Sequence, residues 1–415
     1  MKKLETTKVS LVQLPNDGDA SGRSFGKEEL ELLGQVIRSG TLHATKGIMA
    51  RQLETEFAAQ YGVKHCITVS SGTASLHTAI AAVDPEPGDE VITTPITDMG
   101  GLAAILFQNA IPIFADVDPD TLNLTAETIK ERVTPRTKAI VVVHLFGNPC
   151  DMDPILKLAD RRGIPVIEDS AQAYLTRYQG KLAGTMGAIG CFSLQQTKQM
   201  TSGEGGLVIT NDDALARRMR LFRDKAWGYG DPNPDHYFLA LNYRMTDLQG
   251  AVALAQLRKL ETMVANRRKM AELLSQLLNG VEGLHLPKVT PGGIHTYWRY
   301  CLRVDEKILG VNVNQLAVLL KEYGILSTPR YIQKPAFECA VFKDRKTYGS
   351  SQFPYKGSSR QGLPEVAYDP KDFPGTLKAL SRVLVLPWTE RYTQQHVEYI
   401  AQSLIETVKN VRQSR

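Results

Sequence analysis

A lysine in a polar loop is the residue of this chain whose position is best suited to covalent chemistry. Lys198 follows a strand-like segment that ends near Ser193, and the glycine-rich run 203–206 closes the loop behind it. A lone loop lysine is ordinarily solvated surface. However, a lysine amine can also form an imine with an aldehyde cofactor, and once released it can act as general base and acid. Two further segments decide between these interpretations.

The first of these segments carries two carboxylates at the end of a predicted strand. Val166 and Ile167 are typical of a buried strand, and Glu168 and Asp169 follow directly. One carboxylate could simply cap a turn. The alternative is that Asp169 lies beside a pyridine ring and keeps its nitrogen protonated, because a pyridinium withdraws electrons far better than a neutral ring. Gln172, three residues further on, could then hydrogen-bond a hydroxyl on that ring.

The second segment, 70–76, has the sequence SSGTASL and leads from a predicted strand into a predicted helix. Backbone amides at a helix N-terminus favour an anion, and Gly72 lets the backbone approach a phosphate closely. Ser or Thr at this position is also the usual helix cap, so the signal alone is weak. The chain contains no GxGxxG and no GxxxxGK[ST] motif, so neither a dinucleotide fold nor a P-loop competes.

The elements that position these residues alternate between short apolar strands and amphipathic helices. Alternation of this kind predicts an α/β fold with a mostly parallel sheet, in which ligands bind beyond the carboxyl ends of the strands. Helical patterns at 74–83, 100–108, 126–131, 152–161 and 214–222 separate most of the strands. The predicted strands are 65–70, 90–94, 113–115, 139–144, 165–169, 190–193 and 206–210.

Beyond this region the pattern changes. An apolar helix is expected over 246–260, and charged helical sequence continues to 278 before several Gly and Pro residues break it. We therefore predict a large domain over 1–260 with an N-terminal helical segment, and a smaller domain over 261–415. Residues 345–375, rich in Gly, Pro, Ser and Lys, are expected to form a long loop, and such loops are often functional.

Composition excludes several classes of protein. The 415 residues are 43% hydrophobic and 22% charged, and the formal net charge of +5 is small for this length, so nucleic acid is not an expected partner. No apolar stretch reaches the ~20 residues of a membrane helix, and no apolar run follows the initial Met-Lys-Lys, so we expect neither a membrane span nor a signal peptide. The cysteines lack zinc-site spacing and are typical of reduced thiols, which predicts no metal and a cytoplasmic location; they are Cys66, Cys150, Cys191, Cys301 and Cys339.

Four motifs in order resemble one family: SGTASL, HLFGNPCDMD, IEDSAQA and SLQQTKQMTSGEGG, at 71–76, 144–153, 167–173 and 193–206. Together they resemble the DegT/DnrJ/EryC1/StrS aminotransferases, the sugar aminotransferase branch of fold-type-I pyridoxal-phosphate enzymes. The resemblance extends from the N-terminal helices to Leu386-Pro387. It implies a large domain with a mostly parallel seven-stranded sheet, a smaller α+β C-terminal domain, and pyridoxal 5′-phosphate as cofactor.

The resemblance also implies roles for residues at the reacting end of the cofactor. Lys198 matches the lysine that forms the internal imine, and Asp169 matches the acid that pairs with the pyridinium. Gln172 matches the position that contacts the ring oxygen. We therefore expect Lys198 and Asp169 to be the catalytic residues.

At the phosphate end, the resemblance assigns a further set of contacts. Thr73, Ala74 and Ser193 match phosphate-binding positions, beside Gly72. Asn242 matches an asparagine that reaches the phosphate held by the neighbouring subunit. The expected assembly is therefore a homodimer with a shared active site.

The sequence departs from the family at one place. Family members commonly carry an aromatic residue that stacks on the pyridine ring, and Asp98 stands at that position here. Either Met99 or another apolar group covers the ring, or the alignment to the family is shifted by one residue. The wall of the site on this side is therefore not defined by the sequence.

The expected reaction moves an amino group from glutamate or glutamine to a ketone. Nucleotide-linked keto-sugars are the commoner acceptors in the family, whereas Gln195-Gln196 is reminiscent of members that act on cyclic keto-polyols. Residues 345–375 and 295–298 are candidate substrate contacts, with core packing an equal alternative for Tyr297 and Trp298.

Two other functions remain possible at this level. Dehydratases of the same family carry histidine in place of the lysine, so Lys198 counts against that reading. A regulatory paralogue that binds the cofactor without turnover would also retain these motifs.

Overall fold

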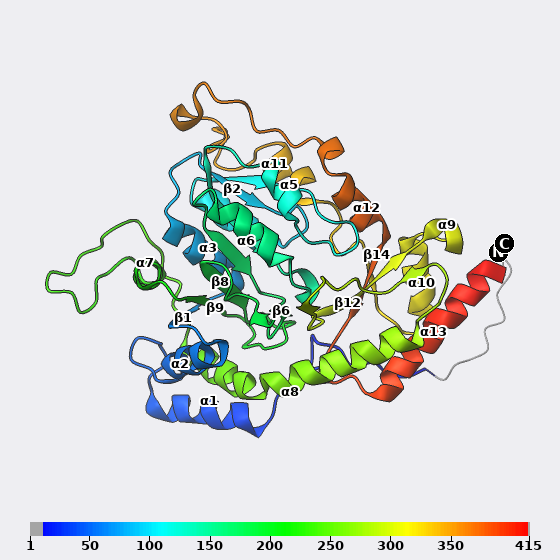
Figure 1. The fold of residues 1–415 in the computed structure, drawn as a ribbon. Coiled ribbons are helices and arrows are strands. Elements are labelled where there is room, and N and C mark those ends of the chain that lie inside the picture. The colour runs from blue at the N-terminus through cyan, green and yellow to red at the C-terminus, as the bar shows by residue number, and fades with distance from the viewer. Residues whose placement is uncertain (1–10, 414–415) are drawn as a thin grey trace.

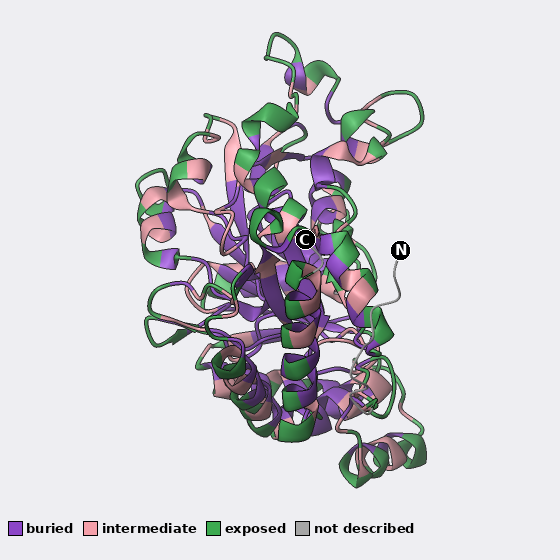
Figure 2. Cartoon of the chain, turned by 90° about the vertical axis from the view of Figure 1, so that its right-hand side faces the viewer, coloured by how far each residue is buried: buried purple, intermediate pink, exposed green. Residues whose placement is uncertain are grey.

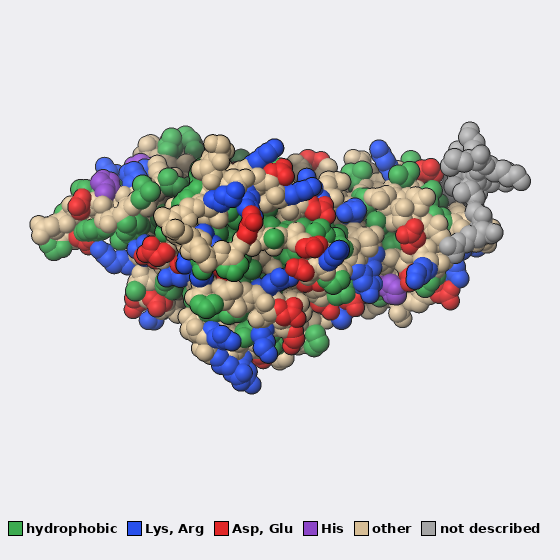
Figure 3. Space-filling view, turned by 90° about the horizontal axis from the view of Figure 1, so that it is seen from above, with side chains coloured by type: hydrophobic (Ala, Val, Ile, Leu, Met, Phe, Trp, Pro, Cys, Tyr) green, Lys and Arg blue, Asp and Glu red, His purple; other side chains and the backbone are tan. Residues whose placement is uncertain are grey.

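The computed structural model describes residues 11–413 (Figure 1). Residues 1–10, on which the expectation of no signal peptide rests, lie outside this range. Among the described residues, no helix is both long and apolar enough to cross a membrane. On the face shown in Figure 3, basic and acidic side chains are interspersed rather than gathered by sign.

A seven-stranded sheet forms the centre of the large domain, in the order β1-β9-β8-β5-β4-β2-β3. β9 pairs antiparallel with both of its neighbours and the remaining pairs are parallel, which confirms the predicted mostly parallel sheet. The strands are β1 (His65–Val69), β2 (Glu90–Thr93), β3 (Ile111–Phe114), β4 (Thr137–Val143), β5 (Val166–Asp169), β8 (Ile189–Ser193) and β9 (Gly206–Thr210).

Both faces of this sheet are buried, which explains why its strands read as continuous apolar runs. Helices α3, α4 and α7 pack on one face. On the other face, α5 and α6 cover one half and α1, α2 and α8 cover the rest. The helices are α1 (Lys27–Ser39), α2 (Met49–Tyr61), α3 (Gly72–Val83), α4 (Met99–Phe107), α5 (Ala126–Lys130), α6 (Met152–Asp160), α7 (Asp213–Arg223) and α8 (Asp247–Leu277).

Helix α8 joins the two parts of the molecule as one continuous 31-residue helix, so the expected boundary at 260/261 falls inside it. Thr246 and Gln249 form a capping box at its start. The second sheet has the order β10-β12-β14-β13, and α10 and α13 pack against it. Its strands are β10 (Leu284–His285), β12 (Arg299–Val304), β13 (Thr328–Pro329) and β14 (Val383–Pro387), and the later helices are α9 (Glu306–Leu309), α10 (Val313–Glu322), α11 (Ala340–Lys343), α12 (Pro374–Arg382) and α13 (Gln394–Gln413).

The core therefore has several parts, and Figure 2 shows the buried residues concentrated in the sheets and on the inner sides of the helices. A short sheet of β6 (Arg177–Tyr178), β7 (Lys181–Leu182) and β11 (Gly293–Ile294) links the two parts of the chain. The segment 345–375 is mostly without regular structure, as predicted. It packs against α4 and β3, where Tyr355 and Phe373 contact a cluster that includes Phe114.

Candidate functional site

A cavity of about 430 Å³ opens at the carboxyl ends of the large-sheet strands. Its walls come from the turns that follow β1, β2, β5 and β8, where α/β sheets usually bind ligands. The small domain contributes two aromatic residues, Trp298 and Tyr331. The cavity brings together these predicted site residues: Gly72, Thr73, Asp169, Gln172, Ser193 and Lys198.

One end of the cavity is built around the start of α3. Ser71 caps this helix, because its Oγ accepts a hydrogen bond from the Ala74 amide at 3.0 Å. A Cβ on Gly72 would lie 2.6 Å from the Cβ of Ser193, so only glycine allows this approach of helix and strand. Thr73 and Ser193 add hydroxyl groups beside the helix N-terminus. Such a combination favours a phosphate.

Ala74 takes a different position from its neighbours. It is buried and does not line the cavity, and its amide hydrogen is already bonded to Ser71. The expected contact between Ala74 and a phosphate therefore stays a prediction.

Asp169 lies at the end of β5, on the cavity wall. Burial raises the pKa of its carboxyl group, while the Ala171 amide, which donates to Oδ1 at 3.1 Å, and the nearby Lys198 act in the opposite direction. Among residues 11–413 no ion pair neutralises this carboxylate. A protonated ring nitrogen would supply the positive partner that the site lacks.

Glu168, the neighbouring carboxylate, has a structural role. It is fully buried, and its oxygens accept hydrogen bonds from the amides of Gly184, Met186 and Gly187 at 2.6–2.8 Å and from His144 Nε2 at 2.8 Å. Successive side chains of a strand point to opposite faces, so Glu168 anchors a turn while Asp169 lines the cavity. The turn-anchoring alternative therefore applies to Glu168, and the pairing of Asp169 with a ring nitrogen stays a prediction.

Gln172 is held in place at both ends of its amide. Its Oε1 accepts from the Phe146 amide at 2.7 Å, and its Nε2 donates to the Tyr331 hydroxyl at 3.2 Å. An amide nitrogen carries two hydrogens, so one remains for a ligand oxygen. This geometry suits the expected contact with the ring oxygen of the cofactor.

Lys198 is partly buried on the cavity wall. Its Nζ lies 4.0 Å from the centroid of the Trp298 ring, and Trp298 donates from Nε1 to the Thr197 carbonyl at 2.8 Å. Burial lowers the pKa of Lys198 to about 8, although Asp169 acts to raise it. A larger fraction of neutral amine is therefore present near neutral pH than for an ordinary lysine, which suits a nucleophile and proton carrier.

Asp98 forms part of the cavity wall that the sequence left undefined. It is the N-cap of α4, with Oδ1 accepting from the Gly100 amide at 2.8 Å, and it lines the cavity. Met99 is partly exposed and does not line the cavity. Within residues 11–413, the aromatic residues that line this cavity are Trp298 and Tyr331, which come from other segments of the chain.

Two aromatic residues of the site depend on tertiary packing. Trp298 was expected either as a substrate contact or as core, and it lies on the cavity wall, whereas Tyr297 packs in the small-domain core. Tyr331 was not predicted, and it packs edge-on against Phe146, 4.7 Å between centroids. Nothing in the sequence around Tyr331 signals this role. The segment 345–375 contributes no residue to the cavity.

Asn242 lies outside the cavity of its own chain. It is exposed, and its Oδ1 accepts from the Arg244 amide at 3.3 Å. It ends a loop that leads away from α7 and projects from the body of the molecule in Figure 1. The position is compatible with the expected contact to a second subunit.

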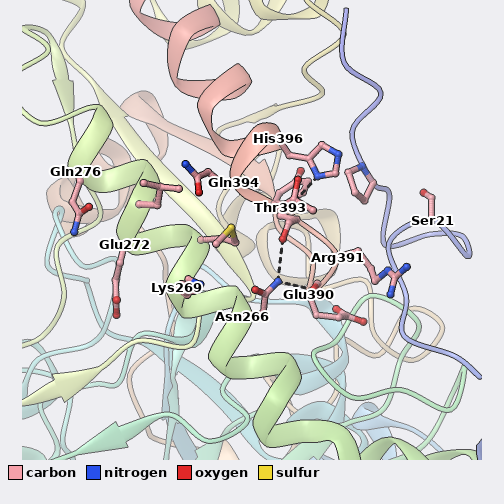
Figure 4. Close-up of a pocket in the computed structure, with 14 residues that line it drawn as sticks. Ser21, Asn266, Lys269, Glu272, Gln276, Glu390, Arg391, Thr393, Gln394 and His396 are labelled. Carbon is pink, nitrogen blue, oxygen red and sulfur yellow. Dashed lines mark hydrogen bonds between the residues drawn. The ribbon is translucent and has the colours of Figure 1, made fainter.

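A larger cavity, of about 900 Å³, lies elsewhere, between α8 and the segment before α13 (Figure 4). Its polar groups are partly used by the fold: the Asn266 amide donates to the carbonyls of Glu390 and Tyr392, and the Glu390 carboxylate pairs with Arg267. None of the strand-end residues lines it. The smaller cavity around Lys198 is therefore the candidate active site.

Pyridoxal phosphate fits the residues of that cavity. The helix start at Gly72 suits the phosphate, the unpaired Asp169 suits a protonated ring nitrogen, and the amine of Lys198 on the cavity wall suits the aldehyde. The fold and the site together define a fold-type-I pyridoxal-phosphate-dependent aminotransferase.

Comparison with known proteins identifies the family. The sequence profile of the DegT/DnrJ/EryC1/StrS aminotransferase family matches residues 23–361, and the chain belongs to this family. It is 40% identical to a GDP-perosamine synthase of Caulobacter vibrioides over 76% of this chain and 84% of that protein. It is 39% identical to an L-glutamine:2-deoxy-scyllo-inosose aminotransferase of Streptomyces kanamyceticus over 73% of this chain and 74% of the other.

Solved structures agree with this assignment. The crystal structure of DesV from S. venezuelae in complex with a ketimine intermediate superimposes with a TM-score of 0.81 at 26% identity. The match covers 92% of this chain and 95% of that one. The predictions of family, fold class, cofactor and enzyme class are thereby confirmed.

Proposed function

We propose that this enzyme transfers an amino group from glutamate or glutamine to a hydroxylated cyclic ketone. The ketone is either a keto-sugar, which in this family is commonly nucleotide-linked, or a cyclic keto-polyol. The relatives support both classes, because one is named for a GDP-linked amino sugar and another for a deoxy-inosose. The observation that carries the proposal is the single cavity that holds Lys198, Asp169 and the helix start at Gly72.

Each of the cavity residues has a separate role in the proposed reaction. Bound pyridoxal phosphate supplies an aldehyde to carry the amino group and a ring that accepts electron density. Lys198 holds the cofactor. When released, its neutral Nζ accepts a proton from the amino donor's carbon and then donates the same proton to the carbon that was the cofactor aldehyde, and the lowered pKa favours this neutral form. Asp169 keeps the ring nitrogen protonated, and the start of α3 binds the phosphate. Gln172 orients the ring through its remaining amide hydrogen.

The working unit in this proposal is a homodimer whose sites are shared. The loop between α7 and α8 exposes large apolar side chains, with Leu239 at 94% and Tyr229 at 60% exposure. Exposed apolar groups gathered on one projecting loop favour burial against a partner. Asn242 lies in the same loop, so the partner surface would bring it to the neighbouring phosphate site.

The proposal also places the enzyme in the cytoplasm, where thiols remain reduced. All five cysteines are unpaired, and four of them are buried.

Amino transfer to a panel of ketones tests the proposal. The loaded enzyme is incubated with L-glutamine or L-glutamate and with keto-inositols or nucleotide-linked ketohexoses, and the amine product is measured by mass spectrometry. Lys198→Ala should abolish product formation while the fold survives. Loss of a ring hydroxyl instead of amine formation would identify a dehydratase, and cofactor binding without any product would identify a regulatory protein.

A further inference from the structure

Asp98 is an acid on the cavity wall that forms no ion pair within the described residues. One of its oxygens, Oδ1, accepts from the Gly100 amide at 2.8 Å as the cap of α4. No hydrogen bond within residues 11–413 occupies Oδ2, and no ion pair of these residues involves Asp98. The residue remains exposed within the cavity. The helix cap therefore accounts for Oδ1 but leaves Oδ2 without a partner among the described residues.

The position of Asp98 is fixed next to the phosphate-binding end of the site. A Cβ on Gly100 would lie 2.3 Å from Thr73 Oγ1, so glycine allows the start of α4 to press against the start of α3. This contact sets Asp98 beside the phosphate-binding loop. The packing of α4 against α3 therefore fixes the position of Asp98 on the cavity wall.

Two other charged residues of the cavity bind the cofactor in the proposed function. Lys198 binds the cofactor aldehyde and Asp169 pairs with the ring nitrogen, so neither can neutralise Asp98. The remaining charged residue on the wall is Glu204, which is also an acid. The part of the cavity left for the acceptor is therefore anionic on the side of this chain.

A free carboxylate in such a place accepts hydrogen bonds and repels negative charge. Hydrogen bonds from hydroxyl groups to a carboxylate are shorter and stronger than those between neutral groups. The start of α3 offsets this negative charge for the cofactor phosphate. A second phosphate, brought in by the acceptor, meets no such compensation on this wall and is repelled by the same carboxylate, and the repulsion grows as water is excluded. The volume of about 430 Å³, which must also hold the cofactor, is at the lower end of the range of about 300–1,000 Å³ for ligand sites, and it suits a compact acceptor.

We propose that Asp98 selects the acceptor by accepting hydrogen bonds from the hydroxyl groups of a neutral polyhydroxylated cyclic ketone, and that it disfavours acceptors carrying a diphosphate. This inference rests on the proposed aminotransferase function and narrows its acceptor to a free keto-polyol. Asp98 is in this view a specificity residue that contacts the substrate.

The test uses substitutions that preserve the helix cap. Asn and Ser cap helices about as well as Asp, so Asp98→Asn and Asp98→Ser remove the charge without removing the cap. Asp212→Asn is a matched control, because Asp212 caps α7 in the same way at the opposite end of the sheet. The loaded enzymes are assayed with a keto-inositol and with a GDP-linked 4-ketohexose, and binding of the corresponding amino-inositol is measured by calorimetry.

For the keto-inositol we expect both Asp98 variants to raise KM and the Kd of the amino-inositol by about tenfold to a hundredfold, the usual worth of a hydrogen bond to a charged group. Discrimination against the GDP-linked ketone should fall, and Asp212→Asn should behave as wild type. KM and Kd changes below about threefold in Asp98→Asn, or a wild-type preference for the GDP-linked ketone, would overturn the inference. So would a change of oligomeric state in Asp98→Asn, because Asp98 would then pair across an interface.

Failure of the underlying function is recognisable separately. In the wild type, the amino donor alone should convert the cofactor from its aldehyde to its amine form, a change visible in its absorbance. If that half-reaction is absent, the aminotransferase proposal fails, whereas the calorimetric comparison of Asp98 variants still decides the role of Asp98.

Discussion

Replacing Asp169 by Asn should lower turnover without lowering the stability of the folded protein, because the buried charge of Asp169 serves catalysis and not folding. The substitution keeps the shape of the side chain, and the Asn oxygen can still accept from the Ala171 amide that now bonds Oδ1 at 3.1 Å. Only the negative charge beside the cofactor ring is lost. We expect the cofactor to stay bound, because the phosphate site around Gly72 and the amine of Lys198 are untouched.

The expected loss of turnover follows from the burial of Asp169 and the absence of a competing charge partner. Removing one preorganised electrostatic contact from a buried active site costs about 10²–10³ in kcat, or about 2.7–4 kcal/mol. The ring nitrogen of the variant should lose its proton, so the effect should reach at least this size in each half-reaction. Rapid-mixing absorbance measurements with glutamate or glutamine report the rate of a single turnover.

Although Asp169→Asn should lose turnover, the cofactor-free variant should be as stable as the wild type or more stable. Burial raises the pKa of Asp169 above its ordinary value of 3.8, so the folded state holds this proton more tightly than the unfolded state. The stabilisation is complete below pH 3.8 and is lost as the pH rises through the folded-state pKa. At neutral pH the ionised acid therefore costs stability, and Asp169→Asn should unfold at the same temperature as wild type or higher.

The neighbouring residue provides the matched control. Each carboxylate oxygen of Glu168 accepts two hydrogen bonds. In Glu168→Gln an NH₂ group replaces one of these oxygens, so two of the four hydrogen bonds are lost, at a cost of about 1–3 kcal/mol for each buried group left unsatisfied. We therefore expect Glu168→Gln to destabilise the protein by about 2–6 kcal/mol. The reasoning is refuted if Asp169→Asn loses less than about tenfold in kcat, about 1.4 kcal/mol, or if it destabilises the cofactor-free protein as much as Glu168→Gln does.

Three further predictions concern the cofactor site and the assembly. The rate of cofactor incorporation into the cofactor-free protein should rise with pH to a midpoint near 8, because only the neutral amine of Lys198 reacts; a midpoint near 10.5 in stopped-flow absorbance would contradict the lowered pKa. Gly72→Ala should weaken cofactor binding in an absorbance titration and cost about 1–3 kcal/mol in denaturant unfolding, because its Cβ would press on Ser193, whereas Gly34→Ala in α1 should leave cofactor affinity unchanged. Asn242→Ala should weaken cofactor retention, and mixing it with Lys198→Ala should restore activity, because one site of each mixed dimer has both residues intact; mixed dimers that form in a tagged pull-down yet remain inactive would exclude a shared site.

Much of the large domain could be predicted because its signals are local. Strands buried on both faces appear as short apolar runs, and all seven begin and end within two residues of the expected bounds. Ile111–Phe114 begins two residues before the predicted strand and includes Pro112, whose carbonyl accepts a hydrogen bond from the Tyr368 hydroxyl at 2.6 Å. The helix expected over 246–260 and its charged continuation form one element, α8, since the change from apolar to charged residues does not end a helix.

The rest of the site could not be read from the sequence because it depends on long-range contacts. Lys198, Asp169 and Gly72 follow strands and were found by their local settings. Trp298 and Tyr331 reach the cavity only because the second sheet packs against the first, a contact that no local pattern encodes. The aromatic residues of 345–375 bury themselves against α4 and β3 instead of reaching the substrate.

The central claim, that Lys198 holds the cofactor, can be tested without any substrate. Treating the cofactor-loaded enzyme with borohydride fixes an imine between cofactor and lysine as a stable amine, and peptide mass spectrometry then locates the added mass. The account predicts a single modified residue, Lys198, and no label at that peptide in Lys198→Ala. Labelling of a different lysine, or an unlabelled peptide in an enzyme that retains its cofactor, would contradict it.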